Sequence, residues 1–317
     1  MHDVVIVGAG PVGTILAGEL ARRDLDVLLL ERRDGERDGS RAIGVHAPVL
    51  AALEPSGVTE RLLDQALRVS VGEARSGGEV IGTVRFDLLS RRFPFVATLP
   101  QPWTERALGT HAPTPRRGTA TDIRSFGDRV VVRTDDDEIV GRIVVNAGGP
   151  RARTLVYRAV PARAYPDRYV MADVVAPGSG VAVVHLDARG VLESFPLPGG
   201  RRRFVAPAPP GAPDDAEVSG EILREALDAR GEVEAAASVD TASWFSIRRV
   251  IAPQMRRGRV FAVGDAAHEI SPMGGQGMNL GLLDAVTLAP MLAEWIRSGR
   301  APDDRLGAWE QRRVRSA

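Results

Sequence analysis

The chain opens with an apolar run at residues 3–7, which predicts a buried strand. A glycine-rich turn follows, and apolar residues at helical spacing then continue to Arg23. A second apolar run, residues 27–31, ends in the acidic Glu31. The pattern therefore predicts a strand, a tight turn, a helix and a second strand. The turn and the start of the helix contain Gly8, Gly10, Pro11, Val12 and Gly13.

The glycines of this turn form a G-x-G-x-x-G motif between a strand and a helix. The missing side chains allow a tight turn, close approach of a pyrophosphate to the backbone, and close packing of the helix on the strand. Glu31, with Arg32 beside it, stands where an acid binds ribose hydroxyls. The motif predicts a dinucleotide site but does not choose between FAD and NAD.

A second strand, turn and helix pattern lies near the C-terminal end. The apolar run 260–263 predicts a short strand that ends at Gly264, and a glycine-rich loop leads into a helix from about residue 278. A carboxylate at a strand end can accept hydrogen bonds from hydroxyls, and glycines expose backbone N–H groups to a flat or anionic ligand. The predicted ligand contacts are Asp265, Pro272, Gly274, Gly275, Gly277, Met278 and Asn279.

The chain between these two patterns is typical of antiparallel sheet. Short apolar or alternating pieces, separated by glycine and polar residues, occupy residues 69–96 and 165–238. Residues 130–145 predict a hairpin whose turn carries the acidic run 135–138. We expect this run to be a solvated turn and no metal site, because no histidine or further carboxylate is spaced around it.

Composition excludes several classes of protein. The 317 residues carry 41 basic and 41 acidic side chains, a balance that favours neither nucleic acid nor an acidic membrane surface. The absence of cysteine excludes thiol catalysis and the disulfide reductases that need a cysteine pair, and it agrees with a cytoplasmic location. No apolar run reaches the roughly 20 residues of a membrane helix.

Taken together, the two glycine-rich patterns resemble the FAD-dependent aromatic hydroxylases, the class A flavoprotein monooxygenases. Within that family the chain is most similar to actinobacterial hydroxylases of polyketides and phenols. The resemblance implies an α/β fold in which a Rossmann-like FAD-binding domain is interrupted by a β-sheet-rich substrate domain. The FAD-binding domain is expected at residues 1–68, 98–163 and 243–317, and the substrate domain at 69–97 and 164–242.

The resemblance also implies further cofactor contacts. In the family, an arginine at the position of Arg41 lies close to the FAD pyrophosphate, and a glutamine at the position of Gln101 contacts the ribityl chain. The helix N-terminus at Met278–Asn279 is expected to stabilise negative charge at the N1/O2 edge of the flavin. Pro272 and Gly274–Gly275 are expected beside the ring. FAD should bind non-covalently, since no cysteine is available for a thioether link.

The implied activity is hydroxylation of a small aromatic or polycyclic substrate by O₂. NAD(P)H serves as a transient reductant, and a C4a-hydroperoxyflavin is the oxygen donor. Because this chemistry belongs to the flavin, no single catalytic acid or base is assigned. We expect the substrate in a cleft between the sheet regions and the flavin edge. Candidate lining residues, each equally compatible with a core role, are Phe86, Phe95, Met171, Phe195 and Met273.

One position departs from the family pattern. An Asp-Gly pair that serves both FAD and the nicotinamide donor is usual where this chain has Gly148–Gly149. We expect the missing acid to slow flavin reduction, and Gly148→Asp to speed anaerobic reduction by NAD(P)H. Two alternatives stay open. One is an FAD enzyme that NAD(P)H does not drive efficiently (an oxidase, a Baeyer–Villiger-type oxygenase or a rearrangement catalyst), and the other is a non-catalytic flavin-fold binding subunit.

Overall fold

A mostly parallel sheet forms the first part of the molecule. The structure, a computed structural model, describes residues 1–35, 42–176 and 178–317 of the chain. The sheet has the order β17-β18-β11-β1-β2-β8, and β10 and β9 extend it from β11. Its central strands run parallel and are buried, as the apolar run at 3–7 predicts. The strands are β1 (His2–Val7), β2 (Val27–Glu31), β8 (Arg116–Arg117), β9 (Ala120–Phe126), β10 (Arg129–Thr134), β11 (Glu138–Asn146), β17 (Arg256–Arg257) and β18 (Val260–Ala262).

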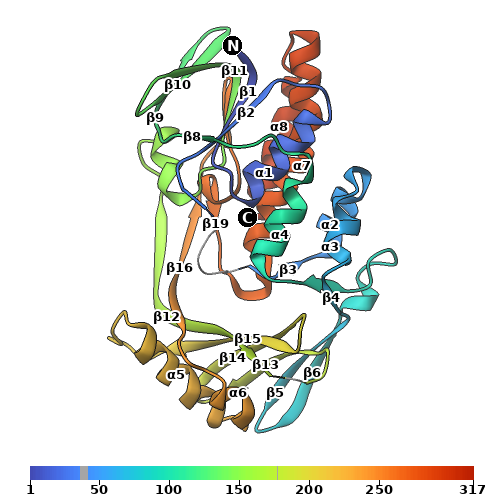
Figure 1. Ribbon diagram of the computed structural model, residues 1–317, viewed down its shortest axis with the longest axis vertical. Helices are drawn as coiled ribbons and strands as arrows, with labels where there is room; N and C mark the ends of the chain where they lie inside the picture. Colours follow the sequence, from blue (N-terminus) through green and yellow to red (C-terminus); the bar gives the residue numbers. More distant parts are fainter. Residues whose placement is uncertain (36–41, 177) are drawn as a thin grey trace.

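Helices α1 and α7 pack against each other beside this sheet (Figure 1). Val12 of α1 fits between two glycines. An added Cβ would lie 2.6 Å from Val12 Cγ2 at Gly281 and 3.0 Å from it at Gly264. Since neither glycine has a side chain, the first turn of α1 can approach both the end of β18 and the start of α7. The helices of this part are α1 (Pro11–Ala21), α4 (Gln101–Leu108), α7 (Gln276–Ser298) and α8 (Asp303–Ser316).

A second sheet forms the other part, with the order β19-β16-β12-β15-β14-β13-β5-β6. Helices α5 and α6 cover one of its faces with an apolar cluster that includes Val170, Leu192 and Phe204 (Figure 1). The opposite face is turned toward the first part. The elements are β5 (Val71–Ser76), β6 (Glu79–Arg85), β12 (Ala162–Val175), β13 (Ala182–Asp187), β14 (Gly190–Leu197), β15 (Arg201–Ala208), β16 (Ser243–Ile251), β19 (His268–Glu269), α5 (Ala216–Asp228) and α6 (Val233–Ala237).

A small sheet joins the two parts. Its order is β3-β7-β4, and it packs with two short helices. Thr98 on β7 donates a hydrogen bond from Oγ1 to the carbonyl of Pro196 on β14 at 2.7 Å, which fixes the small sheet to the second sheet. Its elements are β3 (Gly44–Val45), β4 (Leu67–Val69), β7 (Val96–Thr98), α2 (Ala47–Leu53) and α3 (Val58–Leu63).

Three of the predicted domain boundaries fall within or beside paired strands. The division into two domains itself remains a prediction. The boundaries at 68/69 and 97/98 fall inside β4 and β7, which pair with each other. Residues 243–251 pair with β12 in the second sheet, whereas the sequence prediction assigned 243–317 to the cofactor-binding part. The long strands β12 and β16 run together from one part to the other (Figure 1), so no loop separates the parts at these points.

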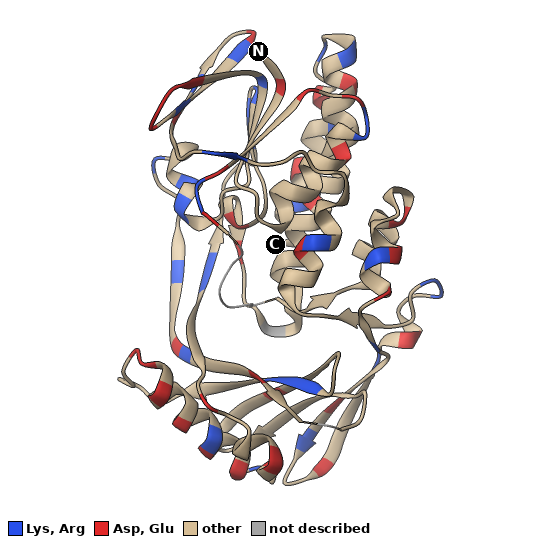
Figure 2. Ribbon diagram, in the orientation of Figure 1, with Lys and Arg blue, Asp and Glu red and all other residues tan. Residues whose placement is uncertain are grey.

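Both signs of charge occur on both parts of the molecule. Figure 2 shows basic and acidic residues intermixed on both parts of the ribbon. Among the described residues, no helix is long and apolar enough to cross a membrane. Within the same ranges, no three histidine or acidic side chains gather as a metal site would require.

Candidate cofactor and active site

Four chain segments meet at the carboxyl ends of the parallel strands. The glycine turn follows β1, Glu31 ends β2, Asn146 ends β11, and Gly264–Asp265 follows β18. Open α/β sheets bind ligands at this edge, because loops and helix N-termini collect there. Segments from the two ends of the chain therefore form one site, as the register of the parallel pairs requires.

The glycines of the turn are required for different reasons. Gly8 has φ +101°, and an added Cβ there would lie 2.6 Å from Gly148 Cα. An added Cβ at Gly13 would lie 1.8 Å from the carbonyl oxygen of Gly8. By contrast, an added Cβ at Gly10 would meet no described atom within 4 Å. Gly8 and Gly13 thus serve internal packing, whereas Gly10 leaves open space in front of α1 that a ligand can fill.

Two helix N-termini are directed into this region without side-chain caps. Neither Gly10 before α1 nor Gly275 before α7 offers a side-chain acceptor, and neither helix has an acidic residue in its first turn. The first N–H groups of a helix have no partner within it, and they carry partial positive charge. Both ends can therefore bind negatively charged or carbonyl oxygens of a ligand.

Glu31 holds the end of β2 against the glycine turn. Its Oε2 accepts from the Ala9 amide at 2.8 Å, and its Oε1 accepts from the amide and Nε of Arg33, each at 3.0 Å. Burial acts to raise the pKa of the Glu31 carboxyl, but the hydrogen bonds from Arg33 and Ala9 together hold that pKa below its usual value. The carboxylate is therefore ionised at neutral pH. Arg32 beside it is exposed.

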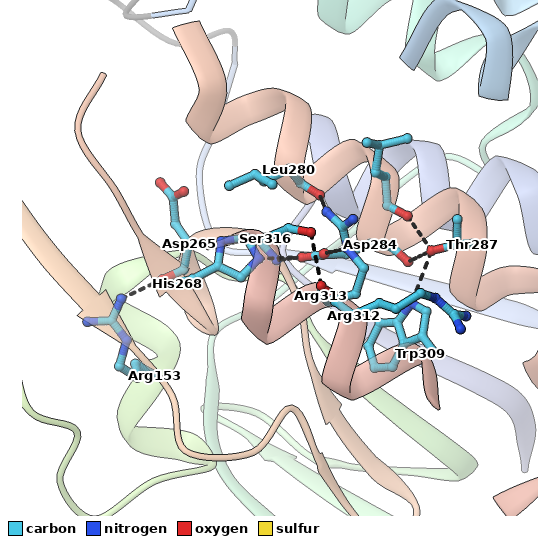
Figure 3. Close-up of polar contacts among 12 residues, drawn as sticks. Arg153, Asp265, His268, Leu280, Asp284, Thr287, Trp309, Arg312, Arg313 and Ser316 are labelled. Atoms are coloured by element: carbon cyan, nitrogen blue, oxygen red, sulfur yellow. Dashed lines mark hydrogen bonds and ion pairs between the residues drawn. The ribbon is translucent and has the colours of Figure 1, made fainter. Parts of the chain in front are cut away.

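Arg153 fixes the loop that carries Asp265. Its Nη2 donates to the carbonyl of Asp265 at 2.6 Å and to Glu269 Oε1 at 2.6 Å, and its Nε donates to the carbonyl of Ala266 at 3.2 Å. Asp265 is exposed, and Figure 3 shows its carboxylate directed away from the buried contacts behind it. Sequence analysis did not select Arg153. An arginine five residues beyond Gly148 was the available signal.

Asn279 fastens the start of α7 to the small sheet. Its Oδ1 accepts from the His46 amide at 2.8 Å, and its Nδ2 donates to the carbonyls of Gly44 and Gly275 at 2.8 and 2.7 Å. His46 Nε2 also donates to the carbonyl of Gly274 at 3.1 Å. Burial lowers the pKa of His46, although this hydrogen bond acts in the opposite direction. The predicted flavin-side loop is thus held in place by a neutral histidine and an amide.

A buried carboxylate behind the loop was not selected from the sequence. Asp284 on α7 is fully buried, and its Oδ2 accepts from the Gly264 amide at 3.0 Å and from His268 Nε2 at 2.6 Å (Figure 3). Its Oδ1 accepts from Arg313 Nε of α8 at 2.6 Å. Arg313 Nη2 also donates to the carbonyl of Leu280 at 2.9 Å. The only signal in the sequence was an aspartate within the apolar stretch of α7.

Other predicted contacts are placed as follows. Gln101 begins α4 and is buried, and its Nε2 donates to Glu105 Oε1 at 2.7 Å. The amide of Ala42 lies 3.5 Å from Gln101 Oε1. Arg41 lies outside the described residues. Pro272 and the α7 residues Gly277 and Met278 lie at or next to the α7 N-terminus.

The five predicted substrate-lining residues lie in different parts of the molecule. Met171 and Phe195 lie, by strand register, on the face of the second sheet turned toward the first part. The ring of Phe86 would meet an added Cβ at Gly72 of β5 at 3.3 Å, so it packs against that sheet as well. Phe95 belongs to the apolar core of the first part. The side chain of Met273 lies outside the described structure.

The faster flavin reduction expected for Gly148→Asp stays a prediction, but the structure adds a packing effect to it. An added Cβ at Gly148 would lie 2.5 Å from Ala152 Cβ and 3.3 Å from Asn146 Oδ1. Asn146, which is fully buried, already accepts from the Gly148 amide at 3.1 Å and donates to the Ala152 carbonyl at 2.7 Å. The substitution would therefore displace this turn as well as add a charge, and it cannot report on flavin reduction alone.

Comparison with known proteins identifies the family. The model of a family described as FAD binding domain matches residues 1–158 and 165–317. The chain belongs to this family. It is 32% identical over 333 residues to the rifampicin monooxygenase of Rhodococcus hoagii, covering 99% of this chain and 68% of that protein. It is 33% identical to the 6-methylpretetramide 4-monooxygenase of Streptomyces rimosus, covering 98% of this chain and 59% of that protein.

Solved structures confirm the α/β aromatic-hydroxylase fold. The anhydrotetracycline hydroxylase of Streptomyces rimosus superposes with a TM-score of 0.77 at 29% identity, covering 98% of this chain and 65% of that one. The p-nitrophenol 4-monooxygenase of Pseudomonas putida has a TM-score of 0.86 at 24% identity, covering 99% and 85%, and supports the fold alone. The family match and these relatives confirm the predicted family and its FAD cofactor. The chain is an FAD-dependent monooxygenase.

The site geometry fits this cofactor. We propose that the N-terminus of α1, with the open space at Gly10, holds the pyrophosphate, and that Glu31 holds the ribose next to the adenine. Asp265 would accept from ribityl hydroxyls, and the N-terminus of α7 would face the carbonyl edge of the flavin ring.

We expect Glu31→Ala and Asp265→Ala each to weaken FAD binding, by about 1.5–3 kcal/mol for every hydrogen bond lost to the carboxylate. Glu31→Ala also leaves the Ala9 amide without its acceptor, so it should loosen the glycine turn as well. Titration of each apoprotein with FAD, followed by flavin fluorescence, measures the effect. Full FAD occupancy of both variants after dilution would show that these assignments are wrong.

Proposed function

We propose that the protein hydroxylates a phenolic or polycyclic aromatic compound with O₂, using electrons that NAD(P)H supplies through FAD. The observation that carries the proposal is the convergence of Glu31, Asp265 and two uncapped helix N-termini at one sheet edge, in a chain that matches the FAD-binding family. Relatives named for rifampicin, 6-methylpretetramide and pentachlorophenol support an aromatic substrate. The absence of cysteine agrees with action in the cytoplasm.

Bound FAD would supply the activation of oxygen, and the protein would position the ring and exclude water. The face of the second sheet turned toward the first part is suited to this task. Met171, Phe245 and Ile247 are buried there, and Tyr169 stacks on Phe245 with ring centroids 5.5 Å apart. An apolar, aromatic face opposite a flavin site supports a flat aromatic substrate.

The test is NADPH and NADH oxidation by the FAD-loaded protein, with and without a panel of phenols and naphthols under ¹⁸O₂. We expect at least one aromatic compound to speed oxidation of the nicotinamide and to gain one ¹⁸O atom, detected by mass spectrometry. Stimulated oxidation that yields only hydrogen peroxide, with no labelled product from any compound, would contradict hydroxylation of this class.

A second candidate is a rearrangement or cyclisation that needs no nicotinamide. Two observations favour it. A dialkyldecalin synthase of Streptomyces rugosporus is 30% identical over 336 residues, covering 99% of this chain and 70% of that protein. In addition, the Gly148–Ala152 contact leaves no room for the acid usual in the hydroxylases. This candidate predicts negligible anaerobic reduction of bound FAD by NAD(P)H in the presence of every aromatic compound, which stopped-flow absorbance measures.

A further inference from the structure

The carboxyl group of Glu193 lies on the face of the second sheet that the proposed function assigns to the substrate. Strand register places Glu193 of β14 directly opposite Val205 of β15, and Val205 opposite Met171 of β12. On its other side Glu193 pairs with Val184 of β13. Its cross-strand neighbours are thus apolar side chains on the same face, since directly paired residues point to the same side of a sheet.

Glu193 is buried and has no polar partner among the described residues. It is 9% exposed, and in that part of the chain no hydrogen bond or ion pair engages its carboxyl. Burial alone raises the pKa of this group to about 7. A buried carboxyl without a partner is costly, and such groups call for a functional explanation.

The charged group of β15 next to Val205 already has a carboxylate partner, although Arg203 Nη1 itself has no hydrogen-bond partner among the described residues. Arg203, on the same face, donates from Nε and Nη2 to the two carboxylate oxygens of Asp173 at 2.6 and 2.8 Å. The charge of Glu193 also acts on the phenol of Tyr169, another titratable group of this face. Burial, Asp167 and Glu193 all raise the pKa of Tyr169, so it stays neutral at physiological pH. Arg203 is therefore already neutralised, and Glu193 keeps its acceptor oxygens for another molecule.

We propose that Glu193 accepts the hydrogen bond of a substrate hydroxyl, and that it selects neutral phenols over aromatic carboxylates. The inference rests on the proposed function for the location of the substrate. An ionised Glu193 can also take the phenolic proton: the phenol O–H bond breaks, an O–H bond forms on the carboxylate, and the negative charge moves to the phenolate oxygen. This charge enriches the ortho and para ring carbons, the positions that an electrophilic oxygen attacks.

A carboxylate at this position also repels anionic ligands. Arg203, two residues from Val205 on β15, has its charge balanced by Asp173, and the other cation of this strand on the same face, Arg201, is exposed and donates to the carbonyl of Asp173. The substrate class is therefore a hydroxylated, uncharged aromatic ring, in agreement with the aromatic stack of Tyr169 and Phe245.

The test measures equilibrium binding and needs no turnover. FAD-loaded protein is titrated with 2-naphthol and with 2-naphthoate from pH 6 to pH 8.5, with the flavin absorbance change and calorimetry as readouts. We expect wild type to bind 2-naphthol at least about tenfold more tightly than 2-naphthoate, with the affinity for 2-naphthol rising as Glu193 ionises. Glu193→Leu should reduce the preference to about twofold or less. Glu193→Gln should retain 2-naphthol binding through its amide oxygen but lose the pH dependence.

Glu79→Gln is the matched control, because Glu79 is an exposed carboxylate on β6 of the same sheet. It should leave both affinities unchanged. Equal preference in wild type and Glu193→Leu, or no measurable binding of 2-naphthol by wild type, would overturn the assignment. If Glu193 controls binding but no labelled product forms, the proposed reaction fails and the binding role stands. If product forms and Glu193→Leu changes nothing, only this inference fails.

Discussion

Asp284→Ala is expected to lower the free energy of unfolding by about 3–5 kcal/mol, because it leaves the buried Arg313 without its counter-charge and His268 without its hydrogen-bond acceptor. Asp284 is fully buried and bonds to His268, Arg313 and the Gly264 amide (Figure 3). These contacts tie α7 to α8 and to the loop of Asp265, so FAD affinity should fall together with stability. Urea unfolding of the apoprotein and FAD titration measure the two effects.

Glu294→Ala provides the control for this variant. Glu294 lies on the same helix and pairs with Arg305 of α8, but both side chains are about half exposed. Exposed ion pairs contribute about 0–1 kcal/mol, so the control should unfold nearly as the wild type does. If Asp284→Ala lowers the free energy of unfolding no more than Glu294→Ala does, the buried carboxylate does not stabilise the fold. The packing of α7 alone would then hold the loop of Asp265.

Gly10→Ala is expected to raise the dissociation constant for FAD by about tenfold or more while changing the stability of the apoprotein by about 1 kcal/mol or less. The new methyl group meets no described atom of the protein within 4 Å, but it occupies the space in front of the α1 N-terminus. Phosphate oxygens could then no longer approach the first N–H groups of the helix. Flavin fluorescence titration and urea unfolding of the apoprotein separate the two quantities.

Gly13→Ala is the informative comparison, since the same methyl group there would lie 1.8 Å from the Gly8 carbonyl oxygen. That overlap requires the turn to move, so this variant should lose stability even without FAD. The pair therefore distinguishes a glycine required by the ligand from one required by the fold. Unchanged FAD affinity in Gly10→Ala would mean that the pyrophosphate lies elsewhere.

Sequence reasoning succeeded where the chemistry is encoded within one short segment. The G-x-G-x-x-G turn, Glu31 at the next strand end and the strand before Asp265 all lie where the pattern predicts them. A strand, a turn and the helix after it are neighbours in the chain, and their geometry follows from local rules on glycine, proline and apolar spacing. The α/β fold class was implied by the family resemblance that these segments carry.

Contacts between distant segments could not be predicted in this way. In the sequence, Gly148 stood out because the family usually has an acid there. In the structure, Ala152 occupies the space that a side chain at this position would need, and the Cα of Gly148 lies against Gly8. Arg153 appeared as one arginine among many, yet it binds two carbonyls of the Asp265 loop. The helical pattern around Asp284 gave no sign that Arg313, 29 residues later, would fold back onto it.

The sequence by itself determined the dinucleotide turn, the acids at the strand ends and the family of the chain, because each depends on residues that are close in sequence. Only the tertiary structure decided which polar groups are satisfied. It gave Asp284 three donors, and among the described residues it gave none to the buried Glu193. The physical reason is that burial and hydrogen-bond partners depend on how whole sheets and helices pack, and packing brings together residues that no local pattern relates.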